Sequence, residues 1–172
     1  MLRELHEELG IDADYAETTG LERFDEAREL VDVGPNLVGK MQRLTPIAAE
    51  RWAEMATAAA ADGVQLLIVS GFRGVEYQAA LIRKKLADGQ QIAAILEVNA
   101  APGFSEHHTG AAVDIATPGS RPLTEEFENT EAYQWLKREA GRFGFSMTYP
   151  RDNPWGITYE PWHWSLKPGG AG

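Results

Sequence analysis

The chain has 172 residues, a net charge of −10 and no cysteine. One domain of this length can fold without cross-links, and the lack of cysteine excludes a disulfide framework and a thiolate zinc site. The negative charge argues against a protein that binds nucleic acid through its phosphates. The sequence contains neither a predicted membrane span nor a predicted signal peptide. We therefore expect a cytoplasmic protein as the chain is given, or a periplasmic or cell-wall protein if a leader was removed.

The first part of the chain, residues 1–44, is charged and only weakly periodic. It predicts a helix-poor N-terminal extension that packs on the body of the protein. A helix is predicted next, over residues 46–62, because Thr45 can cap its N-terminus and Pro46 suits the first helical position. Its apolar positions form one predicted stripe, consisting of Ile47, Trp52, Met55 and Ala59.

The rest of the chain alternates between strand and helix patterns. Because helices precede and follow strands that lie close together in sequence, we expect an α+β fold with an antiparallel sheet flanked by helices. The tail at residues 168–172 is predicted to be disordered. The predicted strands are 64–69, 112–115, 143–147 and 159–166, and the predicted helices are 75–87, 91–98 and 130–142.

Three of the four histidines lie in two short segments that also contain acidic residues. His107 precedes Asp114 in the first segment, and Glu160 precedes His163 in the second. Two imidazoles and one carboxylate leave a position open, as in catalytic zinc sites. Zinc lowers the pKa of its water toward about 7, and Glu160 is the candidate to accept the proton. Arg73 follows the first predicted strand and can supply positive charge for a substrate carboxylate or an oxyanion.

Both segments need a bend before their polar side chains can meet. His107 and Asp114 are seven positions apart, so one unbroken strand would place them on opposite faces of a sheet. Gly110, which lies between them, can supply the bend. In the second segment, Pro161 favours extended or turn geometry at the preceding residue. We therefore expect Glu160 at the mouth of a strand and His163 inside it.

Three ordered motifs resemble the lysostaphin and D-Ala-D-Ala metallopeptidase superfamily, and in particular its VanY-type D-alanyl-D-alanine carboxypeptidases. Residues 105–114 match the signature Ser-x-His-x-x-Gly-x-Ala-x-Asp. The sequence Tyr-Glu-Pro-Trp-His-Trp at residues 159–164 is similar to the second signature. The turn Ser-Gly-Phe-Arg at residues 70–73, followed by Gln78, is similar to the substrate-side motif. The resemblance extends over residues 64–166.

The resemblance implies a small antiparallel sheet flanked by helices, with one zinc ion per chain at the sheet centre, as in the hedgehog and D-Ala-D-Ala peptidase fold. It places the zinc carboxypeptidase domain at residues 45–167. The implied zinc ligands are His107, Asp114 and His163, the catalytic residues are Glu160 and Arg73, and the substrate contacts are Arg73, Gln78 and Ser105. His108 is not a ligand position in this pattern, and we expect it to be structural or to donate to a ligand carboxylate.

The chain departs from the residues that are usual in this family at three positions. Gly74 stands where Ser or Thr is usual, and Thr148 replaces an Arg that is often found before Tyr-Pro. Ser165 follows Trp-His-Trp where an Arg is usual. Two cationic side chains of the pattern are therefore missing. The basic run at residues 83–85 is read as a solvated helix face, because the protein is so acidic.

The implied activity is hydrolysis of the C-terminal D-alanine of peptidoglycan stem peptides or muropeptides, at a D-Ala-D-Ala or an L,D-type bond. Two alternatives stay open. One is a cell-wall endopeptidase of the same superfamily, which would need an open groove. The other is a non-catalytic peptidoglycan-binding module that retains zinc. Such a module has no use for Glu160, so the presence of this residue favours an enzyme.

Overall fold

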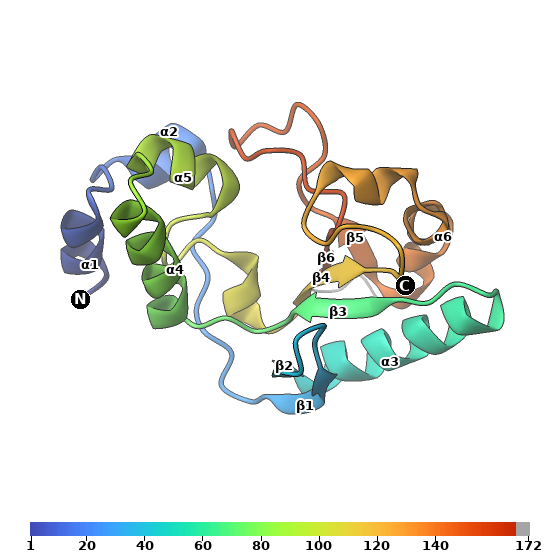
Figure 1. Ribbon diagram of the computed structural model, residues 1–172. Coiled ribbons are helices and arrows are strands. Elements are labelled where there is room, and N and C mark those ends of the chain that lie inside the picture. Colours follow the sequence, from blue (N-terminus) through green and yellow to red (C-terminus); the bar gives the residue numbers. More distant parts are fainter. Residues whose placement is uncertain (168–172) are drawn as a thin grey trace.

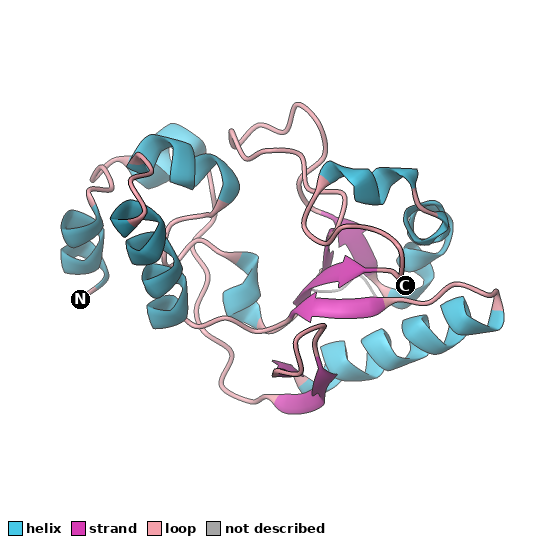
Figure 2. Ribbon diagram, in the orientation of Figure 1, coloured by secondary structure: helices cyan, strands magenta, loops and turns pink. Residues whose placement is uncertain are grey.

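A four-stranded sheet lies at the centre of the computed structural model, which describes residues 1–167 (Figure 1). Its order is β3-β4-β6-β5, and each neighbouring pair is antiparallel. Helices surround the sheet (Figure 2), which confirms the α+β prediction. The strands are β3 (Leu67–Ser70), β4 (Ala112–Ala116), β5 (Phe145–Met147) and β6 (His163–Leu166).

One face of the sheet packs on α3 (Pro46–Ala61) and α6 (Glu131–Glu139). Val113 and Ile115 of β4 lie in the same buried cluster as Trp52 of α3 and Trp135 of α6. Because side chains alternate along a strand, Asp114 between them points to the other face. The sheet therefore has a hydrophobic face and a polar face, and the polar face holds the candidate site.

Helix α3 begins as predicted, since the hydroxyl of Thr45 accepts a hydrogen bond from the N–H of Ala48 at 3.4 Å. The predicted apolar stripe was wrong at one position, because Ile47 is 66% exposed. The neighbouring Ala48 is buried in its place. Positions 48, 52, 55 and 59 repeat every three or four residues on one face, and residue 47 falls about 100° away around the helix.

The prediction of a helix-poor N-terminal segment was wrong. It contains α1 (Leu2–Leu9), α2 (Tyr15–Thr19) and a hairpin of β1 (Val31–Pro35) and β2 (Met41–Leu44). Leu5 and Leu9 of α1 are buried in a second hydrophobic cluster, and burial of each leucine contributes roughly 1.5–3 kcal/mol. They are four positions apart, so they share one face of a helix that is otherwise mostly charged. The charges hide this short stripe in the sequence.

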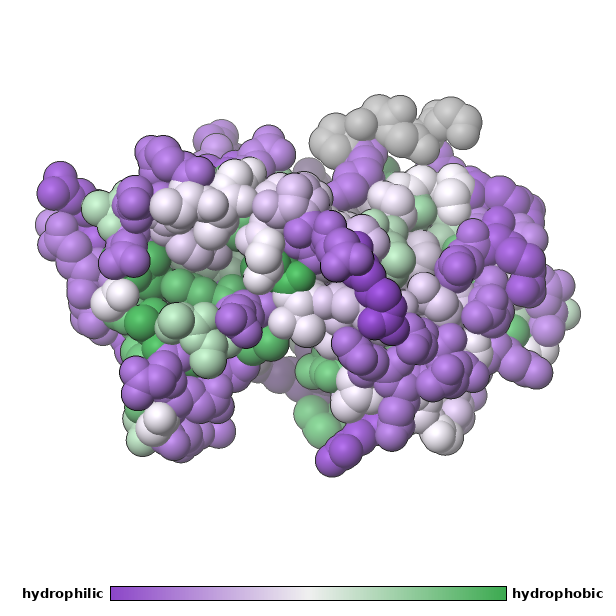
Figure 3. Space-filling model, turned by 90° about the horizontal axis from the view of Figure 1, so that it is seen from above, coloured by the Kyte–Doolittle hydropathy of each residue, from purple (hydrophilic) through white to green (hydrophobic). Residues whose placement is uncertain are grey.

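The second cluster unites α1 and α2 with α4 (Val75–Ala87) and α5 (Ile92–Val98). Ala79 and Ile82 of α4 and Ile95 of α5 contribute to it. Seen from above, hydrophobic residues gather on the half of the molecule that holds these helices, and the other half of this face is mostly hydrophilic (Figure 3). No helix within residues 1–167 has the length and apolar character to cross a membrane.

The N-terminal hairpin braces the turn that follows β3. The side chain of Gln42 accepts the N–H of Gly71 at 2.9 Å, and the backbone carbonyl of Arg43 accepts the N–H of Phe72 at 2.8 Å. A Cβ atom on Gly71 would lie 2.6 Å from that carbonyl oxygen, so only glycine allows this approach. The carboxylate of Glu26 accepts the N–H of Val75 at the start of α4. Residues of the first segment therefore hold the turn that carries Arg73.

Several predicted element ends differ from the structure, each for a local reason. The strand predicted over residues 143–147 begins at Phe145, because residue 143 belongs to a 3₁₀ turn. β3 begins at Leu67, which pairs with Ala116 at the end of β4. β6 begins at His163, after a turn in which Pro161 has no N–H to offer a ladder. The helix predicted to reach residue 142 ends at Glu139 and continues as the 3₁₀ turn η3 (Ala140–Phe143). The predicted disordered tail lies outside the described residues.

Candidate metal centre and active site

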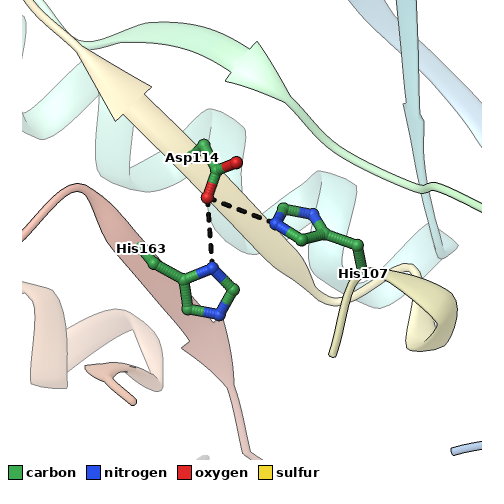
Figure 4. A group of neighbouring side chains, drawn as sticks. All are labelled: His107, Asp114 and His163. Atoms are coloured by element: carbon green, nitrogen blue, oxygen red, sulfur yellow. Dashed lines mark hydrogen bonds and ion pairs between the residues drawn. The ribbon is translucent and has the colours of Figure 1, made fainter. Parts of the chain in front are cut away.

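Within residues 1–167, His107, Asp114 and His163 form one buried group that can hold a metal ion (Figure 4). One nitrogen or oxygen atom of each side chain lies within 4.8 Å of the others. His107 belongs to the 3₁₀ turn η1 (Glu106–Thr109), Asp114 to β4 and His163 to β6. Asp114 and His163 are direct partners in the antiparallel register, so their side chains project from the same face.

Gly110 makes the bend that brings His107 to Asp114. It ends η1 in the left-handed region, with a φ angle of 66°. A Cβ atom there would lie 3.0 Å from Leu30 and 3.1 Å from Thr45. Both the conformation and the close packing favour glycine. The parity argument from the sequence is confirmed, because the chain is not one unbroken strand between the two side chains but turns at Gly110.

The hydrogen bonds of the two histidines define which nitrogen faces the centre. His107 donates from Nδ1 to the carbonyl of Gly71 at 2.7 Å, which leaves a lone pair on Nε2, 3.2 Å from Asp114 Oδ1. His163 has Nε2 3.3 Å from Glu106 Oε1 and Nδ1 3.1 Å from Asp114 Oδ1. An imidazole lone pair and a carboxylate oxygen repel each other unless a cation lies between them. The centre is therefore suited to bind a cation.

The spacing of these atoms fits a small divalent metal. Ligand atoms around a tetrahedral zinc ion lie about 3.3 Å apart, which follows from bond lengths of about 2.0–2.1 Å. The two nitrogen-to-oxygen distances of 3.1 and 3.2 Å are close to this value. The donor set of two imidazoles and one carboxylate leaves a coordination position open, as catalytic zinc sites do.

Without a metal, a proton on His163 supplies the positive charge. Burial alone would lower its pKa, but hydrogen bonds to the carboxylates of Asp114 and Glu106 outweigh burial and raise the pKa to about 10. Burial and the positive charge of Arg73 lower the pKa of His107 to about 4. A metal ion that binds near neutral pH therefore has to displace the proton of His163.

Glu160 lies just before β6, with its side chain 13% exposed and Oε2 3.8 Å from Nδ1 of His163. Burial raises the pKa of this carboxyl group to about 7. A divalent cation at the neighbouring centre would lower this pKa through its charge. A buried carboxyl group with a pKa near neutral, beside a metal-binding group, can accept and release a proton.

Arg73 reaches the same centre from the turn after β3. Its Nη1 is 3.3 Å from the Ser70 hydroxyl and 3.5 Å from Asp114 Oδ2. Its Nε is buried and has no hydrogen-bond partner within residues 1–167. A buried donor without a partner is costly, and an anionic ligand would satisfy it.

His108 holds the Arg73 turn in place rather than touching a metal ligand. It accepts the N–H of Gly103 at Nε2, 3.0 Å away, and donates from Nδ1 to the carbonyl of Arg73, 2.7 Å away. The expectation of a structural role is therefore supported. The alternative, donation to a ligand carboxylate, was wrong, because both ring nitrogens are engaged with the backbone.

Gln78 and Ser105 are both buried and line the same pocket. Gln78 donates from Nε2 to the carbonyl of Ala100 at 2.8 Å, and its Oε1 has no partner among the described residues. Ser105 accepts the N–H of His107 at 3.2 Å and so caps η1. The pocket has a volume of about 320 Å³, and all seven predicted site residues line it: Arg73, Gln78, Ser105, His107, Asp114, Glu160 and His163.

Three further residues of the site were missed in the sequence. Lys85 lines the pocket, although its basic run was read as a solvated face. It lies two helical turns after Gln78, so both residues lie on the same face of the helix, and this spacing could have indicated that Lys85 points toward the site. Tyr149 also lines the pocket, with its ring centroid 4.9 Å from that of His163. Glu106 contacts His163 from a position next to His107, and no local pattern marks it.

A mixed helix-and-sheet fold with a buried His, Asp, His group at its centre has the donor types of a catalytic metal site. The family model described as VanY, D-alanyl-D-alanine carboxypeptidase, matches residues 41–168, and the chain belongs to this family. A D-alanyl-D-alanine carboxypeptidase of Enterococcus faecalis is 38% identical over 117 residues, which are 62% of this chain. The chain spans 42% of the length of that relative.

Solved structures of carboxypeptidases share the fold. The LdcB LD-carboxypeptidase has a TM-score of 0.73 and 31% identity, over 82% of this chain and 69% of that chain. A VanY D,D-pentapeptidase from a VanB-type resistance cassette, in complex with Zn(II), has a TM-score of 0.65 and 33% identity, over 84% of this chain and 79% of that chain. VanYB in complex with D-alanine-D-alanine has a TM-score of 0.66 and 31% identity, over 86% of this chain and 81% of that chain. The predicted family and fold are confirmed, and a relative with a bound zinc ion supports the predicted cofactor.

Proposed function

We propose that the chain carries the catalytic domain, at residues 45–167, of a zinc-dependent carboxypeptidase. Its substrate is the C-terminal D-alanine of peptidoglycan stem peptides or muropeptides. The observation that carries this proposal is that three features meet in one pocket: a metal-binding group, a buried carboxyl group with a pKa of about 7, and an arginine N–H that has no partner among residues 1–167. Membership of the VanY family supports it.

In this proposal His107, Asp114 and His163 hold one zinc ion. When bound, zinc acts as a Lewis acid and lowers the pKa of a water molecule toward about 7. The carboxylate of Glu160 accepts a proton from the water as its oxygen bonds to the carbonyl carbon of the terminal peptide. Glu160 then donates this proton to the nitrogen of the leaving D-alanine as the carbon–nitrogen bond breaks.

Recognition of the free peptide end is assigned to the cationic part of the pocket. Arg73 and Lys85 line it together, and Gln78 Oε1 is an acceptor without a partner among the described residues. A terminal carboxylate next to an amide N–H matches this combination of donors and acceptor. These cations favour a carboxypeptidase over an endopeptidase, whose substrate has no free carboxylate at the cleaved end. Glu160 in turn favours an enzyme over a binding module.

The proposal predicts a strong preference for a free C-terminal carboxylate. Wild-type protein with zinc should release one alanine from a defined pentapeptide or tetrapeptide stem, which mass spectrometry detects. We expect kcat/KM for the same peptide with a C-terminal amide to be about 10–100-fold lower, the loss of one or two charged hydrogen bonds. Cleavage of the pentapeptide, the tetrapeptide or both also distinguishes a D,D-bond from an L,D-bond preference.

The variant Arg73→Met should remove most of this preference by lowering kcat/KM for the free acid. Arg83→Met is the matched control, because Arg83 lies outside the pocket on α4 and pairs with Glu8 at the surface. Equal cleavage of acid and amide by the wild type would contradict the assignment of Arg73. Internal cleavage of cross-linked peptides with no alanine release would favour the endopeptidase.

Activity should rise with pH on the acidic side. Only the ionised form of Glu160 can accept a proton, so raising the pH through its pKa increases the active fraction. Burial places that pKa at about 7 without a metal, and a bound cation lowers it. We therefore expect kcat/KM to increase up to a plateau near neutral pH. A rate that does not change between about pH 5 and 9 would contradict a base with this role.

A further inference from the structure

Glu106 is a buried carboxylate, 6% exposed, that contacts the metal centre from behind. Its Oε1 lies 3.3 Å from Nε2 of His163, the ring nitrogen that points away from Asp114. Its Oε2 accepts a hydrogen bond from the ammonium group of Lys167 at 2.8 Å. The carboxylate thus links a candidate metal ligand to a cation 61 residues away in sequence.

Lys167 occupies a region where the chain departs from its family. Its ammonium group also donates to the hydroxyl of Thr148 at 3.2 Å. Thr148 and Ser165, at which the family resemblance implies an Arg, both line a second pocket of about 760 Å³ together with Glu106 and Lys167. Longer cationic side chains at these two positions would project into this pocket. Lys167 reaches into the same space from just beyond β6.

The tautomer of His163 decides whether it can bind a metal through Nδ1. Asp114 Oδ1 lies 3.1 Å from Nδ1 and attracts a proton to that atom, which would block the metal. Glu106 accepts a hydrogen bond from the proton on Nε2, so that when a metal displaces the proton on Nδ1 the remaining proton stays on Nε2 and the lone pair on Nδ1 is directed at the centre. Carboxylates that accept the second N–H of a metal-binding histidine act in this way.

We propose that Glu106 and Lys167 are a positioning pair for the metal centre, in which Glu106 holds His163 in the metal-binding tautomer and Lys167 replaces the missing arginines as counter-charge to Glu106. The proposal rests on the metal site of the proposed function. A buried carboxylate without a nearby cation is strongly destabilised. Lys167 is suited to compensate it, because its side chain is 43% exposed and reaches Glu106 from the surface.

The test measures zinc affinity of the metal-free protein by competition with a chromophoric chelator. Glu106→Gln, which keeps the shape but not the charge, should weaken zinc binding by about 10–100-fold. Lys167→Met should weaken it by about tenfold, at the lower end of that range. Adding Ser165→Arg to Lys167→Met should restore most of the affinity, since the new guanidinium returns a cation to the same pocket. Lys84→Met, at an exposed position on α4, is the matched control.

A second measurement separates positioning from a merely structural role. The ¹⁵N chemical shifts of His163 should report a protonated Nε2 and a zinc-bound Nδ1 in the wild type, and a mixed population in Glu106→Gln. A structural role would lower the melting temperature without changing the affinity or the tautomer.

The outcomes also separate this proposal from the proposed function. Zinc affinities of Glu106→Gln and Lys167→Met equal to that of Lys84→Met would overturn the positioning pair and leave the zinc site intact. Failure of Ser165→Arg to restore binding would overturn the role of Lys167 as a replacement for the arginines. A wild-type protein that binds no zinc would overturn both proposals.

Discussion

Replacement of Glu160 by Gln should lower kcat by about 10²- to 10⁴-fold, the contribution typical of a general base. The amide keeps the size of the side chain but cannot accept a proton. Among the described residues, the carboxylates that line the pocket are those of Asp114, a proposed metal ligand, and Glu160, whose oxygen lies 3.8 Å from His163 Nδ1. KM should change much less than kcat, because the base acts on the water and not on the peptide end.

Zinc content is the essential companion measurement for this variant. Glu160→Gln should bind zinc as the wild type does, since the three proposed ligands are unchanged. Glu50→Gln, an exposed glutamate on α3, controls for the loss of one negative charge. If Glu160→Gln hydrolyses the stem peptide at the wild-type rate with zinc bound, Glu160 is not the base.

Replacement of His163 by Ala should have the second large effect, on zinc itself. We expect zinc affinity to fall by more than about 100-fold, which exceeds the loss that follows when only the partner of a ligand is removed. His163 supplies one of three ligand atoms and also faces Asp114 and Glu106. Its loss leaves these two buried carboxylates without their shared partner, so the apoprotein should also be less stable.

His6→Ala is the matched control for His163→Ala. His6 hydrogen-bonds the carbonyl of Pro102 at 2.7 Å and lies outside the metal-binding group. This variant should bind zinc like the wild type. Unchanged zinc stoichiometry in His163→Ala would show that the ligand assignment is wrong. A melting curve of the apoprotein distinguishes a lost ligand from an unfolded variant.

Most of the candidate site could be predicted because its residues lie in linear motifs. His107 and Asp114 are close in sequence, and the bend between them needs only one residue in the left-handed conformation, which Gly110 supplies. Glu160 and His163 form the second motif. What the sequence does not contain is the strand register, and it is the pairing of Asp114 with His163 that joins the two motifs.

The residues that were missed act over long distances in sequence. Glu106 gains its role from His163 and Lys167, which are 57 and 61 positions away. Lys85 belongs to a charged run in which Arg83 pairs with Glu8 and Lys84 is exposed, so the local pattern gave no reason to separate it from its neighbours. Such roles depend on tertiary contacts and not on periodicity.

The N-terminal segment was also mispredicted because its structure depends on tertiary contacts. The two buried leucines of α1 are a weak local signal, and the helix is stabilised by packing against α4 and the rest of the second cluster. The start of β3 is set by its pairing with the last residue of β4, which is a property of the sheet, and the start of β6 by the turn at Pro161. Helix α3 was predictable because its cap and proline are local.

In the proposed function, one metal ion held by His107, Asp114 and His163 gives the pocket its carboxypeptidase activity. The most direct test is to titrate metal-free wild-type protein with zinc and to measure alanine release from a defined stem peptide at each step. We expect no release without zinc, a rate that increases in proportion to bound zinc, and saturation at one zinc ion per chain. Full activity in the metal-free protein, or no alanine release at saturation, would contradict the proposed function.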